Sequence, residues 1–156
     1  MTRKGGRRAT ILLAEDDSTM LELTAILLTR LGHDVITAAD GDTALKIFEE
    51  ASAPIHLVIS DGLMPGLKGP QFLRAVRSMS PSTATLLISG TMPPSEAGTS
   101  WLMKPFRPEK LATLVQELLE GCDFARIKRE QSARPGPKEV SPAAPGTPGV
   151  VPRSTT

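Results

Sequence analysis

The chain has 156 residues, one cysteine and a formal net charge of +1, a length that suits one domain with a hydrophobic core and falls short of two. Residues 1–10 carry +4 and residues 123–156 carry +3, which leaves −6 for residues 11–122. This negative charge on residues 11–122 argues against direct DNA binding, because DNA is itself negatively charged. The lone Cys122 excludes an intramolecular disulfide and fits a reducing compartment. No stretch is long enough to span a membrane, so we expect a cytoplasmic protein that does not bind membranes.

Short apolar runs alternate with segments of helical periodicity through residues 9–121. The first run, 11–14, precedes a helix that ends near Leu31. Ser18 can cap this helix, and Asp17 is suited to be a cap or a residue of its first turn. The later units, in order, are a strand at 35–38, a helix between Asp40 and Pro54, a strand ending at Asp61, a helix from Pro70, a strand at 86–89, a strand at 101–103 and a helix from Pro108 to Gly121.

This alternation predicts an α/β domain with a parallel sheet that has helices on both faces. The connection between the fourth and fifth strands departs from the pattern. Only 14 residues separate Ser89 from Lys104, and they include Pro93, Pro94 and the fifth strand itself. An ordinary helix needs about 11 residues without internal helix breakers. The helix between these two strands is therefore predicted to be shortened or missing.

The predicted domain covers residues 9–122, between two ends of different composition. Residues 1–8 are basic and are expected to be disordered. Residues 123–156 are rich in proline and carry few large apolar residues, so they are expected to be largely disordered. Phe124 and Ile127 leave open one or two further helical turns after the last helix. On this interpretation, a chain that ends near Gly121 should still fold.

Polar residues follow the buried strands at the point where each strand ends. Glu15 and Asp16 follow the first, Asp61 ends the third, Ser89 ends the fourth and Lys104 follows the fifth. Ligands bind where the carboxyl ends of parallel strands meet. Clustered carboxylates repel one another unless a cation compensates them, and Mg2+ suits such a site because it takes carboxylate and phosphate oxygens. The pattern predicts a divalent-cation and phosphoryl site, in which an aspartate can be the nucleophile.

Four motifs in this order closely resemble the receiver domain of two-component response regulators. They are ILLAEDD (11–17), LVISDGLMPG (57–66), LLISG (86–90) and LMKPF (102–106). The resemblance covers roughly residues 9–121. It implies a flavodoxin-like, doubly wound, five-stranded parallel sheet of strand order 2-1-3-4-5, with the site at its carboxyl edge.

The resemblance also implies a role for each of the polar residues. Asp61 aligns with the aspartate that accepts a phosphoryl group from the phosphohistidine of a partner kinase. Glu15 and Asp16 align with the acidic pair that holds Mg2+. Lys104 aligns with the lysine that pairs with the phosphoryl group, and Ser89 with the hydroxyl that bonds a phosphoryl oxygen.

Further positions follow from the same resemblance. Gly90 would leave room for the phosphate, and the backbone carbonyl of Leu63 would be a further Mg2+ ligand. The apolar side chain of Leu63 cannot orient a hydrolytic water, which favours slow dephosphorylation. Trp101 falls at the aromatic position that reports phosphorylation, and the Lys104–Pro105 bond is expected to be cis.

These features favour a single-domain response regulator that accepts the phosphoryl group from a histidine kinase or a histidine phosphotransfer protein. It would signal to an unidentified downstream protein by altered protein contacts, and would catalyse nothing beyond its own phosphorylation and dephosphorylation. Two alternatives stay open. A phosphatase of the haloacid-dehalogenase type also uses an aspartate nucleophile at a strand end, but Glu15 would occupy the first place of its Asp-x-Asp motif. The second alternative is an adaptor that has the receiver fold but works without phosphorylation.

Overall fold

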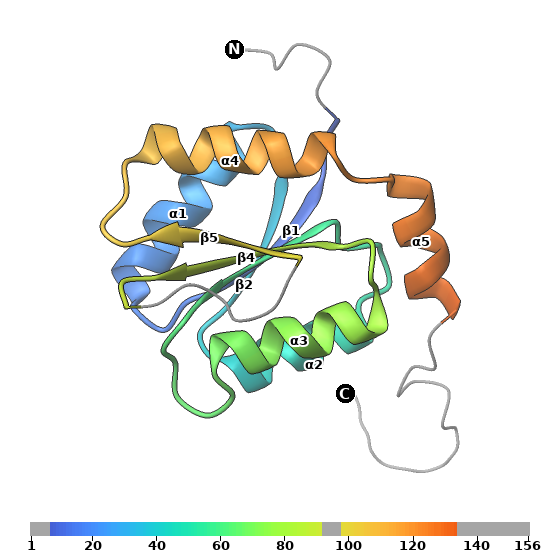
Figure 1. Ribbon diagram of the computed structural model, residues 1–156, viewed down its shortest axis with the longest axis horizontal. Coiled ribbons are helices and arrows are strands. Elements are labelled where there is room, and N and C mark those ends of the chain that lie inside the picture. Colours follow the sequence, from blue (N-terminus) through green and yellow to red (C-terminus); the bar gives the residue numbers. More distant parts are fainter. Residues whose placement is uncertain (1–6, 92–97, 134–156) are drawn as a thin grey trace.

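The computed structural model describes residues 7–91 and 98–133 of the chain (Figure 1). Its strands are β1 (Thr10–Ala14), β2 (Asp34–Ala38), β3 (Leu57–Asp61), β4 (Ala84–Ser89) and β5 (Thr99–Met103). Its helices are α1 (Ser18–Arg30), α2 (Gly41–Glu50), α3 (Gly69–Met79), α4 (Pro108–Glu120) and α5 (Phe124–Ala133). None of the described helices is both long enough and apolar enough to cross a membrane.

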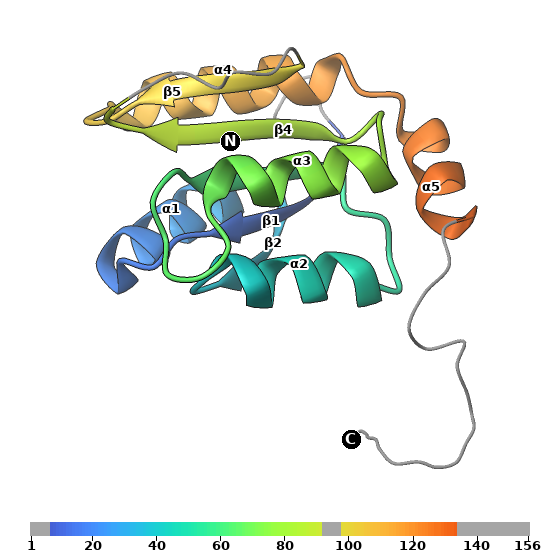
Figure 2. The same cartoon turned by 60° about the horizontal axis from the view of Figure 1, so that its bottom comes forward.

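The five strands form one parallel sheet in the order β2-β1-β3-β4-β5, which confirms the predicted topology. Helices α1 and α4 cover one face of the sheet, and α2 and α3 cover the other (Figures 1 and 2). In this register Ala14 lies beside Ser60, and Asp61 lies beside Ile88. The carboxyl ends of β1, β3 and β4 therefore meet at one edge, where the polar residues were predicted to gather.

The strands alternate between two hydrophobic cores because successive side chains point to opposite faces of a sheet. Ile11 and Leu13 of β1 face the core beneath α1 and α4, whereas Leu12 faces the core beneath α2 and α3. Phe72 of α3, which is fully buried, packs in the second core. With both faces covered, β3 is buried along its whole length, so its last residue is held firmly.

Of the two residues that could begin α1, Asp17 is the cap. The Asp17 carboxylate accepts hydrogen bonds from the backbone N–H groups of Thr19 and Met20, at 3.0 and 3.1 Å. Asp17 keeps an extended backbone, whereas Ser18 is already the first helical residue. An N-cap residue must lie just outside the helix for its side chain to reach these donors. Ser18 therefore cannot fill this position.

In the described residues of the connection between β4 and β5 there is no helix, in agreement with the prediction that the helix between these strands is shortened or missing. β4 ends at Ser89 and β5 begins at Thr99. Gly90, Thr91 and Gly98 are not helical. Residues 92–97 lie outside the described residues.

The folded part extends beyond the predicted boundary at residue 122. Residues 124–133, expected to be largely disordered, form α5 against the starts of the strands (Figure 1). Ile127 is fully buried. The Gln131 side chain accepts a hydrogen bond from the backbone N–H of Ile55 and donates one to its carbonyl, at 2.9 and 2.7 Å. This helix thus satisfies buried backbone groups just before β3. The Pro-rich residues 134–156 lie outside the described residues.

Two residues of the basic N-terminal segment also contact the domain. Arg8 forms an ion pair with Asp34, with 2.6 Å between Nη2 and Oδ1. The guanidinium of Arg7 lies 4.1 Å from the centroid of the Phe124 ring, which also stacks on His56 at 4.0 Å. Ordered structure therefore begins before the predicted start at Ala9. Residues 1–6 lie outside the described residues.

Candidate functional site

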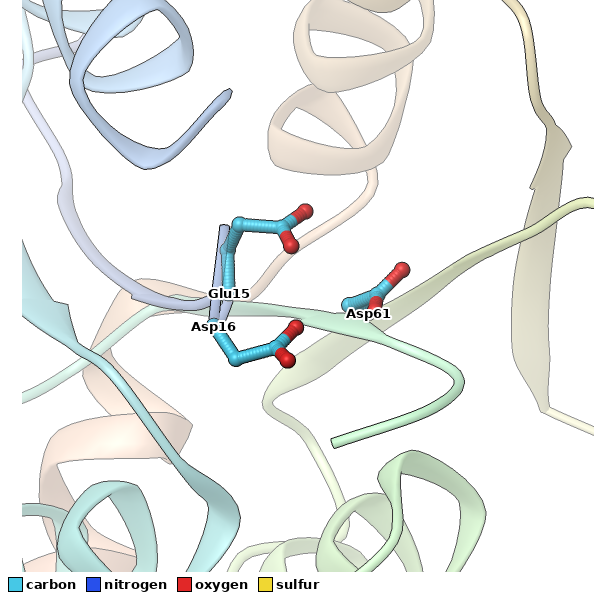
Figure 3. A group of neighbouring side chains, drawn as sticks. All are labelled: Glu15, Asp16 and Asp61. Carbon is cyan, nitrogen blue, oxygen red and sulfur yellow. The ribbon is translucent and has the colours of Figure 1, made fainter. Parts of the chain in front are cut away.

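Three carboxylates converge at the carboxyl edge of the sheet, as predicted. Glu15 and Asp16 follow β1, and Asp61 is the last residue of β3; their side chains point into one space (Figure 3). Each offers an oxygen, and these oxygens lie within 4.8 Å of one another. Glu15 and Asp61 are buried and Asp16 is exposed. The site thus has two fixed carboxylates and one that is open to solvent.

Lys104 joins this group from the segment after β5. Its Nζ lies 2.6 Å from Asp61 Oδ1 and 3.4 Å from Glu15 Oε1. Partial burial lowers the pKa of Lys104, but the Asp61 and Glu15 carboxylates outweigh this effect, and the net shift of the pKa is upward. Lys104 therefore keeps its charge at the point where a phosphoryl group on Asp61 would place its own.

The charge on Glu15 is only partly compensated. Burial and then repulsion from Asp61 raise the pKa of Glu15, although the backbone N–H of Asp17 donates to its carboxylate at 3.1 Å and Lys104 is nearby. A divalent cation among the three carboxylates would supply the missing positive charge. The donor set also matches Mg2+, which binds through a few carboxylate oxygens and retains water. The residues present therefore fit the predicted metal.

Ser89 lies at the end of β4 with its hydroxyl held by a local turn. Its Oγ accepts a hydrogen bond from the backbone N–H of Thr91 at 3.2 Å and lies 3.1 Å from the Thr91 hydroxyl. Behind it, a Cβ added at Gly62 would come within 3.1 Å of Ser89 Cβ. The Ser89 hydroxyl thus belongs to the edge of the sheet that carries Asp61, with Thr91 as its present partner.

The remaining predicted residues fit the arrangement to different degrees. The Lys104–Pro105 bond is cis, which confirms the expectation. Gly90 is exposed, and a Cβ there would make only ordinary contacts with Lys104, at 3.7 Å; its role in admitting phosphate stays a prediction. Leu63 is 65% exposed in the loop after β3, and its carbonyl as a metal ligand is likewise a prediction. Trp101 is partly buried in the second core.

Sequence patterns missed the residues that hold the loop after Asp61. The Asp42 carboxylate accepts a hydrogen bond from the backbone N–H of Leu67 at 3.1 Å. Lys68 Nζ donates to the carbonyl of Met64 at 3.1 Å. Asp42 and Leu67 are 25 positions apart, so no local motif joins them, and only the tertiary structure brings them together.

Solved receiver domains share this fold. The receiver domain of the hybrid histidine kinase CckA is similar with a TM-score of 0.63 and 38% identity, covering 70% of this chain and 98% of that one. The chemotaxis protein CheY4 of Vibrio cholerae is similar with a TM-score of 0.65 and 32% identity, covering 72% of this chain and 100% of that one.

Curated proteins give the same result. The sensor kinase CckA of Brucella abortus is 36% identical over 122 residues, which are 74% of this chain and 13% of the kinase. YrkP of Bacillus subtilis, described as an uncharacterized transcriptional regulatory protein, is 32% identical over 127 residues, which are 78% of this chain and 54% of that protein. The chain thus spans a small part of the kinase and about half of the regulator. Residues 11–116 match the family defined as the response regulator receiver domain, and the chain belongs to this family.

Proposed function

We propose that the domain accepts one phosphoryl group on Asp61, in a Mg2+-dependent transfer from the phosphohistidine of a histidine kinase or a phosphotransfer protein. The observation that carries this proposal is the ion pair of 2.6 Å between Asp61 and Lys104, beside two further carboxylates whose oxygens lie within 4.8 Å. A buried nucleophile, a fixed cation and an acidic pair that can hold a metal are parts that suit phosphoryl transfer.

In the proposed transfer, an oxygen of Asp61 attacks the phosphorus of the donor. The new O–P bond forms as the N–P bond of phosphohistidine breaks, and the imidazole takes the electron pair. Lys104, already paired with Asp61, balances the charge on the phosphoryl oxygens. Mg2+, when bound, neutralises charge on the transferred group; Glu15, Asp16, Asp61 and the Leu63 carbonyl are the groups that we propose hold it.

The output that we propose is a change in protein contacts. The Ser89 hydroxyl would exchange its bond with Thr91 for a bond to the phosphoryl oxygen, and Thr91 begins the connection to β5. The phosphorylated state is thus expected to alter this connection. That the chain acts as a single-domain regulator, without binding DNA and in the cytoplasm, is part of the same proposal. It rests on the acidic charge of residues 11–122 and on the single cysteine.

Acetyl phosphate, a small phosphoryl donor, tests the assignment without a cognate kinase. The protein incubated with acetyl phosphate and Mg2+ should gain the mass of one phosphoryl group, detected by intact-mass spectrometry. The gain should vanish in Asp61→Asn and when EDTA removes the metal. Glu50→Gln changes an exposed carboxylate at the other end of α2 and is a control that should be phosphorylated. Equal labelling of Asp61→Asn would place the acceptor elsewhere.

The two alternatives predict different results in the same assays. A phosphatase of the haloacid-dehalogenase type would hydrolyse p-nitrophenyl phosphate rapidly over many turnovers, whereas a receiver can release further product only as fast as its own aspartyl phosphate is hydrolysed. A phosphorylation-independent adaptor would not take up the phosphoryl group at all. The motif disfavours the phosphatase, since Glu15 stands at the first position of the Asp-x-Asp pattern.

A further inference from the structure

The loop of residues 62–68 joins Asp61 to α3 and carries Leu63, the expected carbonyl ligand of the metal. Its base is closed by a hydrogen bond from the Gly69 N–H to the Gly62 carbonyl, at 3.2 Å. Across the loop, Lys68 Nζ donates to the carbonyl of Met64, whose side chain is buried. The loop is therefore fixed at its base and across its middle.

The far side of this loop rests on the first turn of α2. The Asp42 carboxylate accepts a hydrogen bond from the Leu67 N–H at 3.1 Å. Gly66 has a φ of +73°, and a Cβ at this position would collide with Asp42 Oδ2. At Gly41, a Cβ would collide with the Leu67 carbonyl. Two glycines thus allow the loop and the helix to approach closely, and Asp42 supplies the polar contact between them.

We propose that Asp42 is a positioning residue for the phosphorylation site. The inference rests on the proposed function and deepens it. Asp42 touches no reacting group; it acts through the loop, because the hydrogen bond at Leu67 restrains the backbone that carries Leu63. A site works best when its ligands are held before the metal and phosphoryl group arrive, and the hydrogen bond from Leu67 to Asp42 supplies such a restraint on the loop.

The variants Asp42→Ala, Asp42→Asn and Glu50→Ala separate this role from charge and from general stability. Asparagine keeps an oxygen that accepts from Leu67, and Glu50→Ala removes an exposed carboxylate from the same helix. Asp42→Ala should weaken Mg2+ binding, followed by Trp101 fluorescence, by roughly 3–10-fold, the range for loss of one hydrogen bond. Labelling by acetyl phosphate should slow by a similar factor. Asp42→Asn and Glu50→Ala should stay near wild type.

Hydrogen exchange at the Leu67 amide shows whether the contact itself is broken. Its exchange should accelerate in Asp42→Ala and stay slow in Asp42→Asn, with the Gly69 amide as an internal reference. Gly66→Ala gives a second route, since the added Cβ displaces the same carboxylate and should weaken Mg2+ binding in the same direction.

Two results would overturn the inference while leaving the proposed function intact. One is wild-type Mg2+ affinity and labelling in Asp42→Ala despite fast exchange at Leu67. The other is an equal loss in Asp42→Ala and Asp42→Asn, which would assign the effect to charge. Failure of the proposed function is recognised separately, because the wild-type protein would then take up no phosphoryl group.

Discussion

Among single residues, Glu15 is the one whose burial at the site should destabilise the metal-free protein. Its pKa is raised by burial and by Asp61, so the folded state binds a proton at Glu15 more tightly than the unfolded state does. The stabilisation from this group is fully present below the ordinary glutamate pKa of 4.5 and is lost as pH rises through the raised pKa of the folded state. At neutral pH, the ionised carboxylate therefore destabilises the metal-free fold.

Glu15→Gln should raise the melting temperature of the metal-free protein at pH 7.5 by a few degrees, because the amide removes a buried charge while preserving the shape of the side chain. The gain should shrink as pH falls through the raised pKa of Glu15, because the folded wild-type protein then binds a proton at this carboxylate. The same variant should bind Mg2+ more weakly. Melting curves in EDTA at several pH values measure the effect, and a gain that grows toward low pH would contradict it.

The Asp61–Lys104 pair is the other decisive feature at the scale of residues. Both positions could be predicted because each follows a short apolar run, and parallel strands bring such positions together. The distance between the Asp61 and Lys104 side chains could not be predicted, since it depends on the register of β3, β4 and β5. The Asp42–Leu67 contact escaped prediction entirely, because neither residue belongs to a pattern that indicates the other.

At the scale of elements, the strands and helices α1 to α4 follow from local periodicity, whereas α5 does not. Its sequence, FARIKREQSA, places only Phe124 and Ile127 as large apolar residues among charged ones. What holds it is mostly polar and distant in sequence. Glu130 accepts hydrogen bonds from the Ser82 N–H and hydroxyl, both at 2.8 Å, and Gln131 bonds to Ile55. The sequence therefore left one or two helical turns open at this position, but its composition gave no sign of a separate helix packed on the domain.

Truncation after Gly121 should now destabilise the domain, contrary to the expectation from sequence. Burial of a side chain such as Ile127 is worth about 1.5–3 kcal/mol, and the hydrogen bonds of Glu130 and Gln131 add to it, for a loss of about 3 kcal/mol in all. Urea unfolding measures it, with a chain ending at Ala133 as control. Equal stability of the two truncated chains would show that α5 contributes nothing.

The chain that ends at Gly121 should still take up a phosphoryl group under conditions in which it is folded. Helix α5 lies against the starts of the strands, whereas Asp61 lies at their carboxyl ends (Figure 1). Labelling by acetyl phosphate in the absence of urea tests this separation. A folded chain that is labelled much more slowly than the full one would show that α5 influences the site across the sheet.

At the scale of the whole molecule, metal binding should be visible as stability. A ligand that binds only the folded state adds about 2.7 kcal/mol at one hundred times its dissociation constant. Melting temperature should therefore rise with Mg2+ concentration. Asp16→Ala should remove most of this rise and leave the metal-free melting temperature nearly unchanged, since Asp16 is exposed. A full Mg2+ response in Asp16→Ala would exclude it as a ligand.

The contact between Arg7 and Phe124 has a consequence for protein engineering. It places the first described residue beside the start of α5, and a helix of 10 residues spans about 15 Å. The two ends of the described part are thus separated by at most the length of α5 plus the reach of the two contacting side chains, on the side away from Asp61. Modules whose ends lie close together tolerate insertion into other chains. Grafted into a surface loop of a host protein, residues 7–133 would present their reactive edge outward, as a phosphorylation-responsive insert.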